Sequence, residues 1–167
     1  MNKFVSRFLV GATAVLATVL GVTAPASAAG FHEIRLQQSN ECLDVYMART
    51  FNDASVITYG CHGGDNQKWE ITSVGGGYNQ IKVKHSGKCL DVGWLEGSGN
   101  AYVRVKNCDS GSETQKWRLQ GYTGFGSYFS LANLGLHGSC ADKSSNDTFL
   151  IMWDRCHGGS NQKWREN

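Results

Sequence analysis

The sequence has little proline and no long apolar pattern of the kind that predicts a helix. Pro25 is the single proline among 167 residues, and no apolar stripe with the period of a helix continues beyond two turns. Glycine is abundant instead, with 21 residues, and the segments between glycines alternate apolar and polar residues with a period of two. Such alternation is typical of short β-strands. We therefore expect an all-β fold.

An excess of positive charge is also missing. The chain has 16 Lys and Arg residues against 14 Asp and Glu, and two of the basic residues, Lys3 and Arg7, lie in an N-terminal segment that we expect to be removed. The remaining 139 residues then carry 14 charges of each sign. Phosphate binding requires clustered Lys and Arg, so we expect no nucleic-acid partner.

The N-terminal segment predicts export. Lys3 and Arg7 are followed by an almost wholly apolar run, 8–21, and by a small-residue cleavage site at Ala26-Ser27-Ala28. A span of the bilayer needs about 20 continuous apolar residues, and threonines interrupt this shorter run. We interpret residues 1–28 as a signal peptide and residues 29–167 as one secreted, extracellular domain without membrane insertion after cleavage.

The tripeptide Gln-Lys-Trp occurs three times, with its tryptophans 48 and 47 residues apart. A period of this length indicates a structural unit copied in tandem, with approximate repeats 31–72, 73–120 and 121–167. Each repeat holds four candidate strands, and three such units must pool their apolar faces in a closed or capped barrel. We expect a structural role for the repeated side chains, with tryptophans in the core and glutamine amides bonded to turn backbone: Gln67, Trp69, Gln115, Trp117, Gln162 and Trp164.

Six cysteines lie in the exported part, two in each repeat. None has the Cys-x-x-Cys spacing of a zinc site, and an even number in an exported protein indicates disulfides. Six cysteines permit 15 pairings. If each repeat is one unit, the pairs are Cys42 with Cys61, Cys89 with Cys108, and Cys140 with Cys156. We expect no metal and no cofactor.

The chain resembles the ricin-type lectin family. The resemblance rests on Cys-Leu-Asp-Val at 42–45 and 89–92, on Cys-Ala-Asp-Lys at 140–143, and on the three Gln-Lys-Trp copies. It covers residues 31–167 and implies a β-trefoil of three four-stranded repeats, each with an internal disulfide and at most one sugar pocket. The chain is also similar to the carbohydrate-binding modules of secreted bacterial glycoside hydrolases. The implied function is non-catalytic binding of a polysaccharide or cell-surface glycan of galactose or xylan type.

The family builds each pocket from one repeat. It uses an aspartate two residues after the first cysteine, an aromatic residue two before the second cysteine, often a histidine just after it, and an asparagine before the glutamine. A flat ring takes the C–H face of a sugar, and fixed polar groups bond its hydroxyls. The first repeat matches at every position, with Asp44, Tyr59, His62 and Asn66.

The third repeat keeps Asp142, His157 and Asn161, but counting back from Cys156 puts Asp154 at the aromatic position and Trp153 one residue earlier. Two interpretations of Trp153 stay open. Alternation along the strand makes it a core residue, whereas a bulge in the shortened connection returns it to the surface as the missing ring. The predicted sugar-binding set includes Trp153.

The second repeat departs further from the family pattern. It keeps Asp91, but Lys106 stands at the aromatic position, Asp109 follows Cys108, and Thr114 replaces the asparagine. We expect this pocket to lack its stacking platform.

Two other classes of function compete with glycan binding. A glycoside hydrolase needs two carboxylates at one bond, but Asp44, Asp91 and Asp142 are related by the repeat and are expected to lie far apart. The alternative of a protein-binding trefoil, such as a protease inhibitor or a toxin-associated adaptor, stays open, although no loop in the sequence marks it. A neutral, disulfide-bonded trefoil is expected to be a monomer.

Overall fold

The computed structural model describes residues 30–94, 100–144 and 149–167. The expected signal peptide, residues 1–28, lies outside the described residues. The strands, in chain order, are β1 (Ile34–Leu36), β2 (Cys42–Val45), β3 (Ala54–Tyr59), β4 (Trp69–Gly75), β5 (Tyr78–Val83), β6 (Cys89–Trp94), β7 (Ala101–Lys106), β8 (Trp117–Gln120), β9 (Ser130–Asn133), β10 (Cys140–Lys143), β11 (Leu150–Trp153) and β12 (Trp164–Glu166). Four short 3-10 helices join them: η1 (Tyr46–Ala48), η2 (Asp65–Gln67), η3 (Glu113–Gln115) and η4 (Ser160–Gln162). No helical segment in these ranges has the length and apolar content to cross a bilayer.

Six strands close a barrel. Antiparallel ladders join β12 to β1, β4 to β5, β5 to β8, and β8 to β9. Isolated bridges close the two remaining contacts of the ring. His32, just before β1, pairs with Trp69 of β4, and Phe129, just before β9, pairs with Trp164 of β12. The closed ring leaves few unpaired edges in the barrel wall.

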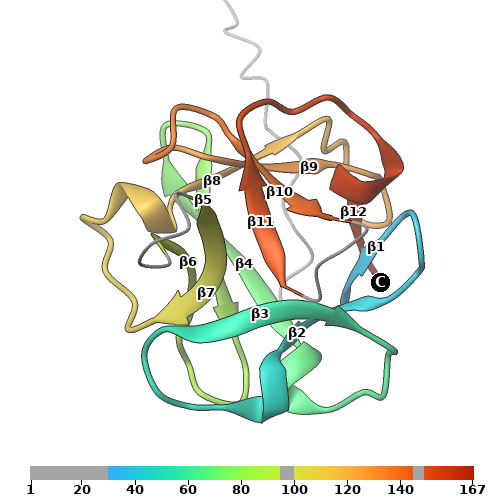
Figure 1. Cartoon of the computed structure of the whole chain (residues 1–167), viewed down its shortest axis with the longest axis vertical. Coiled ribbons are helices and arrows are strands. Elements are labelled where there is room, and N and C mark those ends of the chain that lie inside the picture. Colours follow the sequence, from blue (N-terminus) through green and yellow to red (C-terminus); the bar gives the residue numbers. More distant parts are fainter. Residues whose placement is uncertain (1–29, 95–99, 145–148) are drawn as a thin grey trace, which may run out of the picture.

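The hairpins β2–β3, β6–β7 and β10–β11 cap one end of the barrel. Their second strands, β3, β7 and β11, approach one another near the centre of Figure 1. Backbone pairing links each hairpin to the next in a cycle: Ser55 with Arg104, Tyr102 with Ile151, and Phe149 with Ile57. This three-fold arrangement of four-stranded units is a β-trefoil, so the predicted fold is confirmed.

Three tryptophans anchor the core of the barrel. Trp69, Trp117 and Trp164 begin β4, β8 and β12, and each is 0% exposed. The Trp69 Nε1 donates to the Leu43 carbonyl at 2.9 Å, and the Trp117 Nε1 donates to the Leu90 carbonyl at 3.0 Å. Within the described ranges the Trp164 Nε1 is buried without a hydrogen-bond partner. Buried apolar side chains from all three repeats, among them Ile34, Leu90 and Leu131, form one cluster with these rings.

The disulfides pair as the repeats indicate. They join Cys42 to Cys61, Cys89 to Cys108, and Cys140 to Cys156, with sequence separations of 19, 19 and 16 residues. Closing loops of this length contributes about 3 kcal/mol each in the chain-entropy model. Each bridge ties the first residue of a hairpin to the turn that precedes the Gln-Lys-Trp segment, so the predicted pairing is confirmed.

Candidate functional site

A cavity of about 400 Å³ opens on the first repeat. It holds all four residues that the sequence singled out there, together with the three residues of η1 and Ile57 of β3. The lining residues are Asp44, Tyr46, Met47, Ala48, Ile57, Tyr59, His62 and Asn66. The cavity is large enough for one sugar ring, because small-molecule sites start at about 300 Å³.

Asp44 forms the floor of the cavity and is held rigidly. Only 3% of the residue is exposed. Its Oδ2 accepts the Gln67 Nε2–H at 2.7 Å, and the Asn66 Nδ2 lies 3.1 Å from both carboxylate oxygens. The His62 Nε2 is 3.3 Å from Oδ2. A carboxylate fixed by three side chains is a preorganised acceptor for a hydroxyl group entering the cavity.

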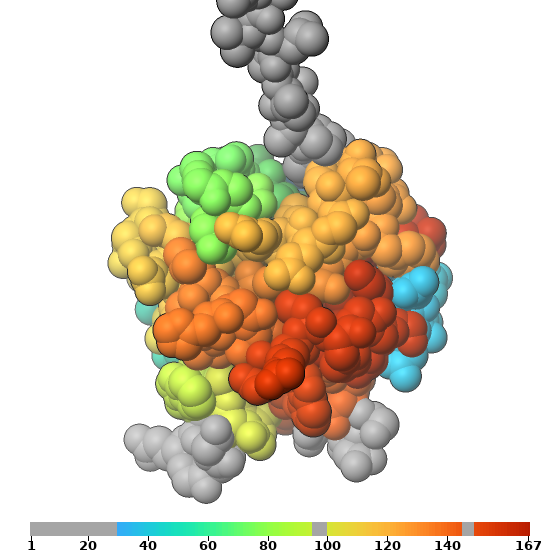
Figure 2. All heavy atoms as spheres, turned by 90° about the horizontal axis from the view of Figure 1, so that it is seen from above, coloured from blue at the N-terminus to red at the C-terminus, as the bar shows by residue number. Residues whose placement is uncertain are grey.

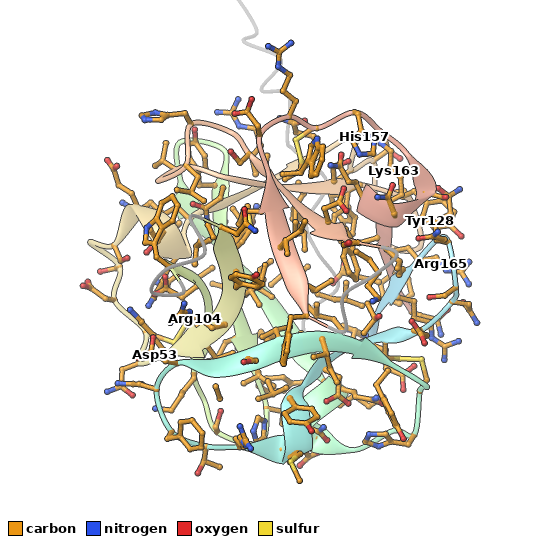
Figure 3. The ribbon with its side chains drawn as sticks, viewed as in Figure 1. Asp53, Arg104, Tyr128, His157, Lys163 and Arg165 are labelled. Atoms are coloured by element: carbon orange, nitrogen blue, oxygen red, sulfur yellow. A yellow bond between two sulfur atoms is a disulfide. The ribbon has the colours of Figure 1, made fainter. Side chains whose placement is uncertain are left out.

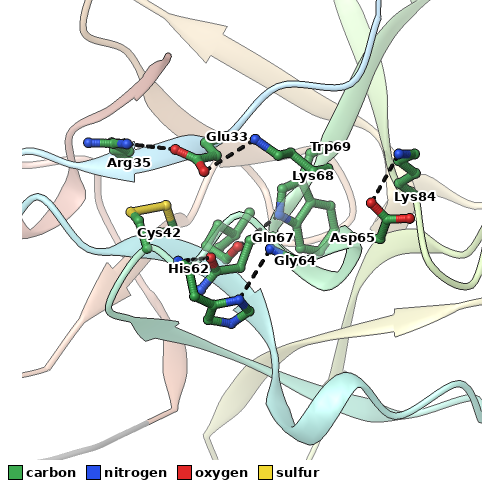
Figure 4. A network of polar contacts seen from close by, with 12 residues as sticks. Glu33, Arg35, Cys42, His62, Gly64, Asp65, Gln67, Lys68, Trp69 and Lys84 are labelled. Atoms are coloured by element: carbon green, nitrogen blue, oxygen red, sulfur yellow. Dashed lines mark hydrogen bonds and ion pairs between the residues drawn. A yellow bond between two sulfur atoms is a disulfide. The ribbon is translucent and has the colours of Figure 1, made fainter.

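The proton of a neutral His62 is placed by a local contact. The Gly64 N–H donates to the His62 Nδ1 at 3.2 Å, which leaves Nε2 to carry the proton toward Asp44. The lack of a side chain at Gly64 leaves room for the side chains of this turn. A Cβ atom there would lie 2.7 Å from both the Asn66 Oδ1 and the His62 Cε1. Figure 4 shows this contact beside Gln67 and Trp69.

Tyr59 supplies the exposed ring. It ends β3 opposite Cys42, is 58% exposed, and lies 6.2 Å from the His62 ring in an edge-on arrangement. An exposed aromatic face above a fixed carboxylate can take the C–H side of a pyranose while the carboxylate takes its hydroxyls. The structure therefore brings Asp44, Tyr59, His62 and Asn66 together around one cavity.

The third repeat repeats this geometry. The Asn161 Nδ2 lies 3.0 Å from both oxygens of Asp142, the Gln162 Nε2 donates to its Oδ2 at 2.9 Å, and the His157 Nε2 is 3.2 Å from the same oxygen. The Gly159 N–H donates to the His157 Nδ1, as Gly64 does to His62. His157 is labelled in Figure 3 beside Lys163.

Trp153 takes the position of Tyr59. It pairs with Cys140 as Tyr59 pairs with Cys42, and it is 51% exposed, so the interpretation as a core residue is wrong. Two residues separate it from Cys156, whereas Gly60 alone separates Tyr59 from Cys61. The extra residue lies beyond the strand and leaves the ladder register unchanged. Part of the β10–β11 connection, residues 145–148, lies outside the described residues.

The second repeat keeps the buried carboxylate but replaces its surroundings. The Gln115 Nε2 donates to Asp91 at 2.8 Å, and Lys106 faces Cys89 where the other repeats place a ring. The exposed Trp94 ends β6, next to residues outside the described ranges.

Arg104 fills space beside that carboxylate. It pairs with Asp91 where Ile57 pairs with Asp44, and its guanidinium lies so close to Gly93 that a Cβ on Gly93 would clash with it. The Arg104 Nη1 also donates to Asp53 at 3.2 Å, a pair labelled in Figure 3. A cation therefore occupies the position that carries an apolar wall residue in the first repeat.

The glutamines have a role that the sequence did not reveal. Each is buried, and its Oε1 accepts the N–H of the residue after the second cysteine, as the Gln67 Oε1 does from His62 at 2.8 Å. This contact with turn backbone was expected. The Nε2, however, donates to the pocket carboxylate, so the repeated tripeptide positions Asp44 as well as supporting the core.

The cavity wall formed by Tyr46, Met47 and Ala48 was also missed. Tyr46 follows Asp44 by two residues, and the period of a strand would have placed both on one face. Met47 and Ala48 carried no such signal. They adopt left-handed φ values of 54° and 50°, which residues other than glycine rarely adopt.

One group of possible metal ligands occurs among the described residues, formed by Glu33, Cys42 and Cys61. Both sulfurs belong to a disulfide and so provide no thiolate. The Glu33 carboxylate is paired with Arg35 and Lys68, as Figure 4 shows. These residues do not fit a metal ion.

Burial raises the pKa of Asp44 above its ordinary value of 3.8, and the contacts with Gln67, His62 and Asn66 offset this only in part. Because the folded-state pKa is the higher one, the contribution of Asp44 to stability is present below pH 3.8 and is lost as the pH rises through the raised pKa. Ligand affinity changes with pH in the opposite direction, because a ligand hydroxyl donates its hydrogen bond to the ionised carboxylate of Asp44. We expect affinity at the first repeat to fall on acidification at a pH above 3.8.

Titration of ligand affinity between about pH 7 and pH 4, with tryptophan fluorescence reporting the folded state, checks this expectation. In His62→Gln the transition should move to higher pH, because the charge of His62 lowers the Asp44 pKa. An affinity that stays constant down to pH 4 would contradict the assignment of Asp44 as the acceptor.

Known proteins share these features. The family model of the ricin-type beta-trefoil lectin domain covers residues 30–164. A designed three-fold symmetric protein, ThreeFoil, is 33% identical, with a TM-score of 0.71 over 82% of this chain and 97% of that one.

Two natural proteins share the fold at lower identity. An exo-beta-1,3-galactanase from Clostridium thermocellum is 23% identical with a TM-score of 0.69, and the match covers 82% of this chain and 30% of the galactanase chain. The C-half of the earthworm R-type lectin, solved in complex with GalNAc, is 20% identical with a TM-score of 0.60, over 83% of this chain and 99% of that one.

Proposed function

Starting from the premise that the chain belongs to the ricin-type beta-trefoil lectin family, we propose that it is a secreted, non-catalytic lectin for galactose- or xylan-type glycans. The first-repeat cavity is its main site, and the third repeat supplies a second one. The observation that carries the proposal is the fixed Asp44 carboxylate beneath the exposed Tyr59 ring in a cavity of about 400 Å³. The GalNAc-bound earthworm lectin and the galactanase lend support by sharing the fold.

Each contact in the cavity is weak by itself. A hydroxyl bonded to Asp44 contributes about 1.5 to 3 kcal/mol, neutral partners about 0.5 to 1.5 kcal/mol each, and the ring of Tyr59 roughly 1 to 2 kcal/mol. Association costs at least about 4 kcal/mol. The contacts exceed this cost by a few kcal/mol at most, so a single site binds weakly, with a Kd on the order of millimolar. Useful retention comes from two repeats engaging one polymer or surface.

Secretion is supported by the N-terminal segment and by the disulfides. Lys3, Arg7 and the apolar run 8–21 precede a small-residue cleavage site. Three disulfides require an oxidising compartment to form and persist. Recovery of the protein from culture medium with Ala29 at its N-terminus is the direct check.

A glycan array identifies the sugar, and substitution of the platform residues tests the site. In Tyr59→Ala and in Trp153→Ala, retention on immobilised galactan or xylan should fall by about 5- to 30-fold per site, because each loses roughly 1 to 2 kcal/mol of ring contact. Both side chains are more than half exposed, so the folding transition should hardly change.

Lys106→Ala is the matched control, because Lys106 occupies the same ladder position in the second repeat. It should leave retention unchanged. Retention that is equal in the parent, the two single variants and their combination would defeat the proposed function.

A further inference from the structure

The first-repeat cavity continues into an exposed surface on the same repeat. We call it the aromatic ledge and define it by Tyr46, Met47, Arg49 and Phe51. Tyr46 and Met47 line the cavity. The Arg49 guanidinium then lies 5.2 Å from the Tyr46 ring centre and 5.6 Å from the Phe51 ring centre. One cation flanked by two rings thus connects the cavity to a ring outside it.

The ledge is open to solvent. Met47 is 70% exposed and Phe51 is 56% exposed. Among the described residues no carboxylate pairs with Arg49, whose Nη2 makes one weak contact, 3.7 Å from the Met47 sulfur. A guanidinium has five N–H donors. Most of these are therefore available to hydroxyl groups of a ligand, between two apolar faces that suit the C–H sides of sugar rings.

The ledge is held in place by the second repeat. The His85 Nε2 donates to the Arg49 carbonyl at 3.1 Å. Farther along, the Asn52 Oδ1 accepts both the Lys88 Nζ at 2.9 Å and the Asn107 N–H at 2.9 Å, and the Asp53 N–H donates to the Val105 carbonyl. An exposed segment fixed at several points loses little freedom when a ligand binds.

Backbone strain concentrates in the same segment. Met47, Ala48 and Asp53 all have positive φ, at 54°, 50° and 68°. Each such residue costs about 1 to 3 kcal/mol and persists only where the surrounding structure enforces it, most often at ligand sites. The corresponding residue two positions after the pocket aspartate is Gly93 in the second repeat and Ser144 in the third, so neither has the ring of Tyr46.

We propose that the aromatic ledge binds the second and third sugar residues of a glycan chain whose first residue occupies the cavity. The first repeat then recognises oligosaccharide chains rather than isolated terminal sugars. The inference rests on the proposed function, because it takes a sugar in the cavity as its starting point. Tyr46 belongs to both the cavity and the ledge, and this favours a longer glycan over an unrelated partner as the ligand of the ledge.

The test compares chain lengths in a Trp153→Ala background, which weakens the third-repeat site. The probes are galactose and β-1,3-linked galacto-oligosaccharides of two to four residues, and xylose and β-1,4-linked xylo-oligosaccharides of two to four residues, titrated by calorimetry. For the series that binds, affinity should rise about tenfold from one residue to three and then level off. Phe51→Ala should reduce this gain to about twofold or less, with monosaccharide affinity unchanged.

Two control variants test whether the aromatic ring at Phe51 accounts for the gain with chain length. Phe51→Trp keeps an aromatic face and should retain the gain with chain length. Phe125→Ala removes another exposed phenylalanine, 52% exposed and packed edge-on against His32, and should also retain it.

Equal affinity for one and three residues would overturn the inference and leave the proposed function standing. So would a Phe51→Ala variant that weakens monosaccharide and trisaccharide equally, or one that converts a dimer to a monomer in size-exclusion chromatography, which would assign the ledge to a second copy of the chain. Absence of binding to every member of both series would overturn the proposed function together with the inference.

Discussion

Asp44→Ala is expected to abolish glycan binding at the first repeat. The substitution removes the one charged acceptor on the cavity floor, worth about 1.5 to 3 kcal/mol, or roughly 10- to 150-fold in affinity. Because the intact site is expected to bind only with a Kd on the order of millimolar, such a loss places binding beyond detection. Titration with the glycan identified by the array measures it directly.

The same substitution also affects stability. Asp44 accepts bonds from Gln67 and Asn66, and its loss leaves the buried Gln67 Nε2 with only the Gly60 carbonyl at 3.1 Å. Burial opposes this carboxylate, as its raised pKa indicates, so part of the loss is offset. We expect the free energy of unfolding to fall by about 1 to 3 kcal/mol.

Asp91→Ala distinguishes the effect on glycan affinity from the effect on stability. Asp91 is equally buried and accepts the Gln115 Nε2 at 2.8 Å, but its repeat has Lys106 in place of a ring. It should lose stability to a similar extent and keep full glycan affinity. If Asp91→Ala loses affinity as severely as Asp44→Ala, the effect is one of stability and the first-repeat assignment fails.

Truncation of a repeat tryptophan is expected to have the largest effect on folding. Trp69→Ala or Trp117→Ala removes a side chain that is 0% exposed and should lower the free energy of unfolding by about 3 to 5 kcal/mol. Domains of this size are stable by only about 5 to 15 kcal/mol in total. Denaturant titration of each variant gives the change. Trp94→Ala, at a tryptophan that is 61% exposed, should stay within about 0.5 kcal/mol of the parent.

Replacement by phenylalanine distinguishes the three copies. Trp69→Phe and Trp117→Phe leave the buried Leu43 and Leu90 carbonyls without their indole donor, at a cost of about 1 to 3 kcal/mol each. Trp164→Phe should cost less, because its Nε1 has no partner within the described ranges. Equal losses at all three positions would show that packing alone, without the indole hydrogen bond, determines the effect.

Much of the first-repeat site could be predicted because the resemblance to the lectin family supplies local spacing rules, and this repeat obeys them at every position. Asp44 lies two residues after Cys42, and the disulfide to Cys61 brings Tyr59, His62 and Asn66 to the same place. The third repeat shows where such rules fail. Counting back from Cys156 displaced Trp153 by one residue, whereas the β10–β11 ladder, which pairs it with Cys140, sets the direction of its side chain.

Contacts between repeats could not be read from the sequence. Arg104 lies beside Gly93 and bonds Asp53, which is 51 residues away in the chain. The aromatic ledge is fixed by His85 and Asn107, both from the second repeat. Figure 2 shows the repeats packed tightly together, with segments from the first, second and third meeting on one face.

The repeat in the sequence determined a barrel of three four-stranded units, its tryptophan core and the disulfide pairing, because each depends on a pattern that recurs with the repeat. The resemblance to the lectin family identified this barrel as a β-trefoil. Periodic apolar residues specify which face of a strand is buried, and three copies of one unit can bury those faces only against one another. The tertiary structure alone decided that Trp153 takes the ring position of the third pocket and that Arg104 lies beside the carboxylate of the second. Both placements depend on ladder register, which the spacing of residues along one repeat does not encode.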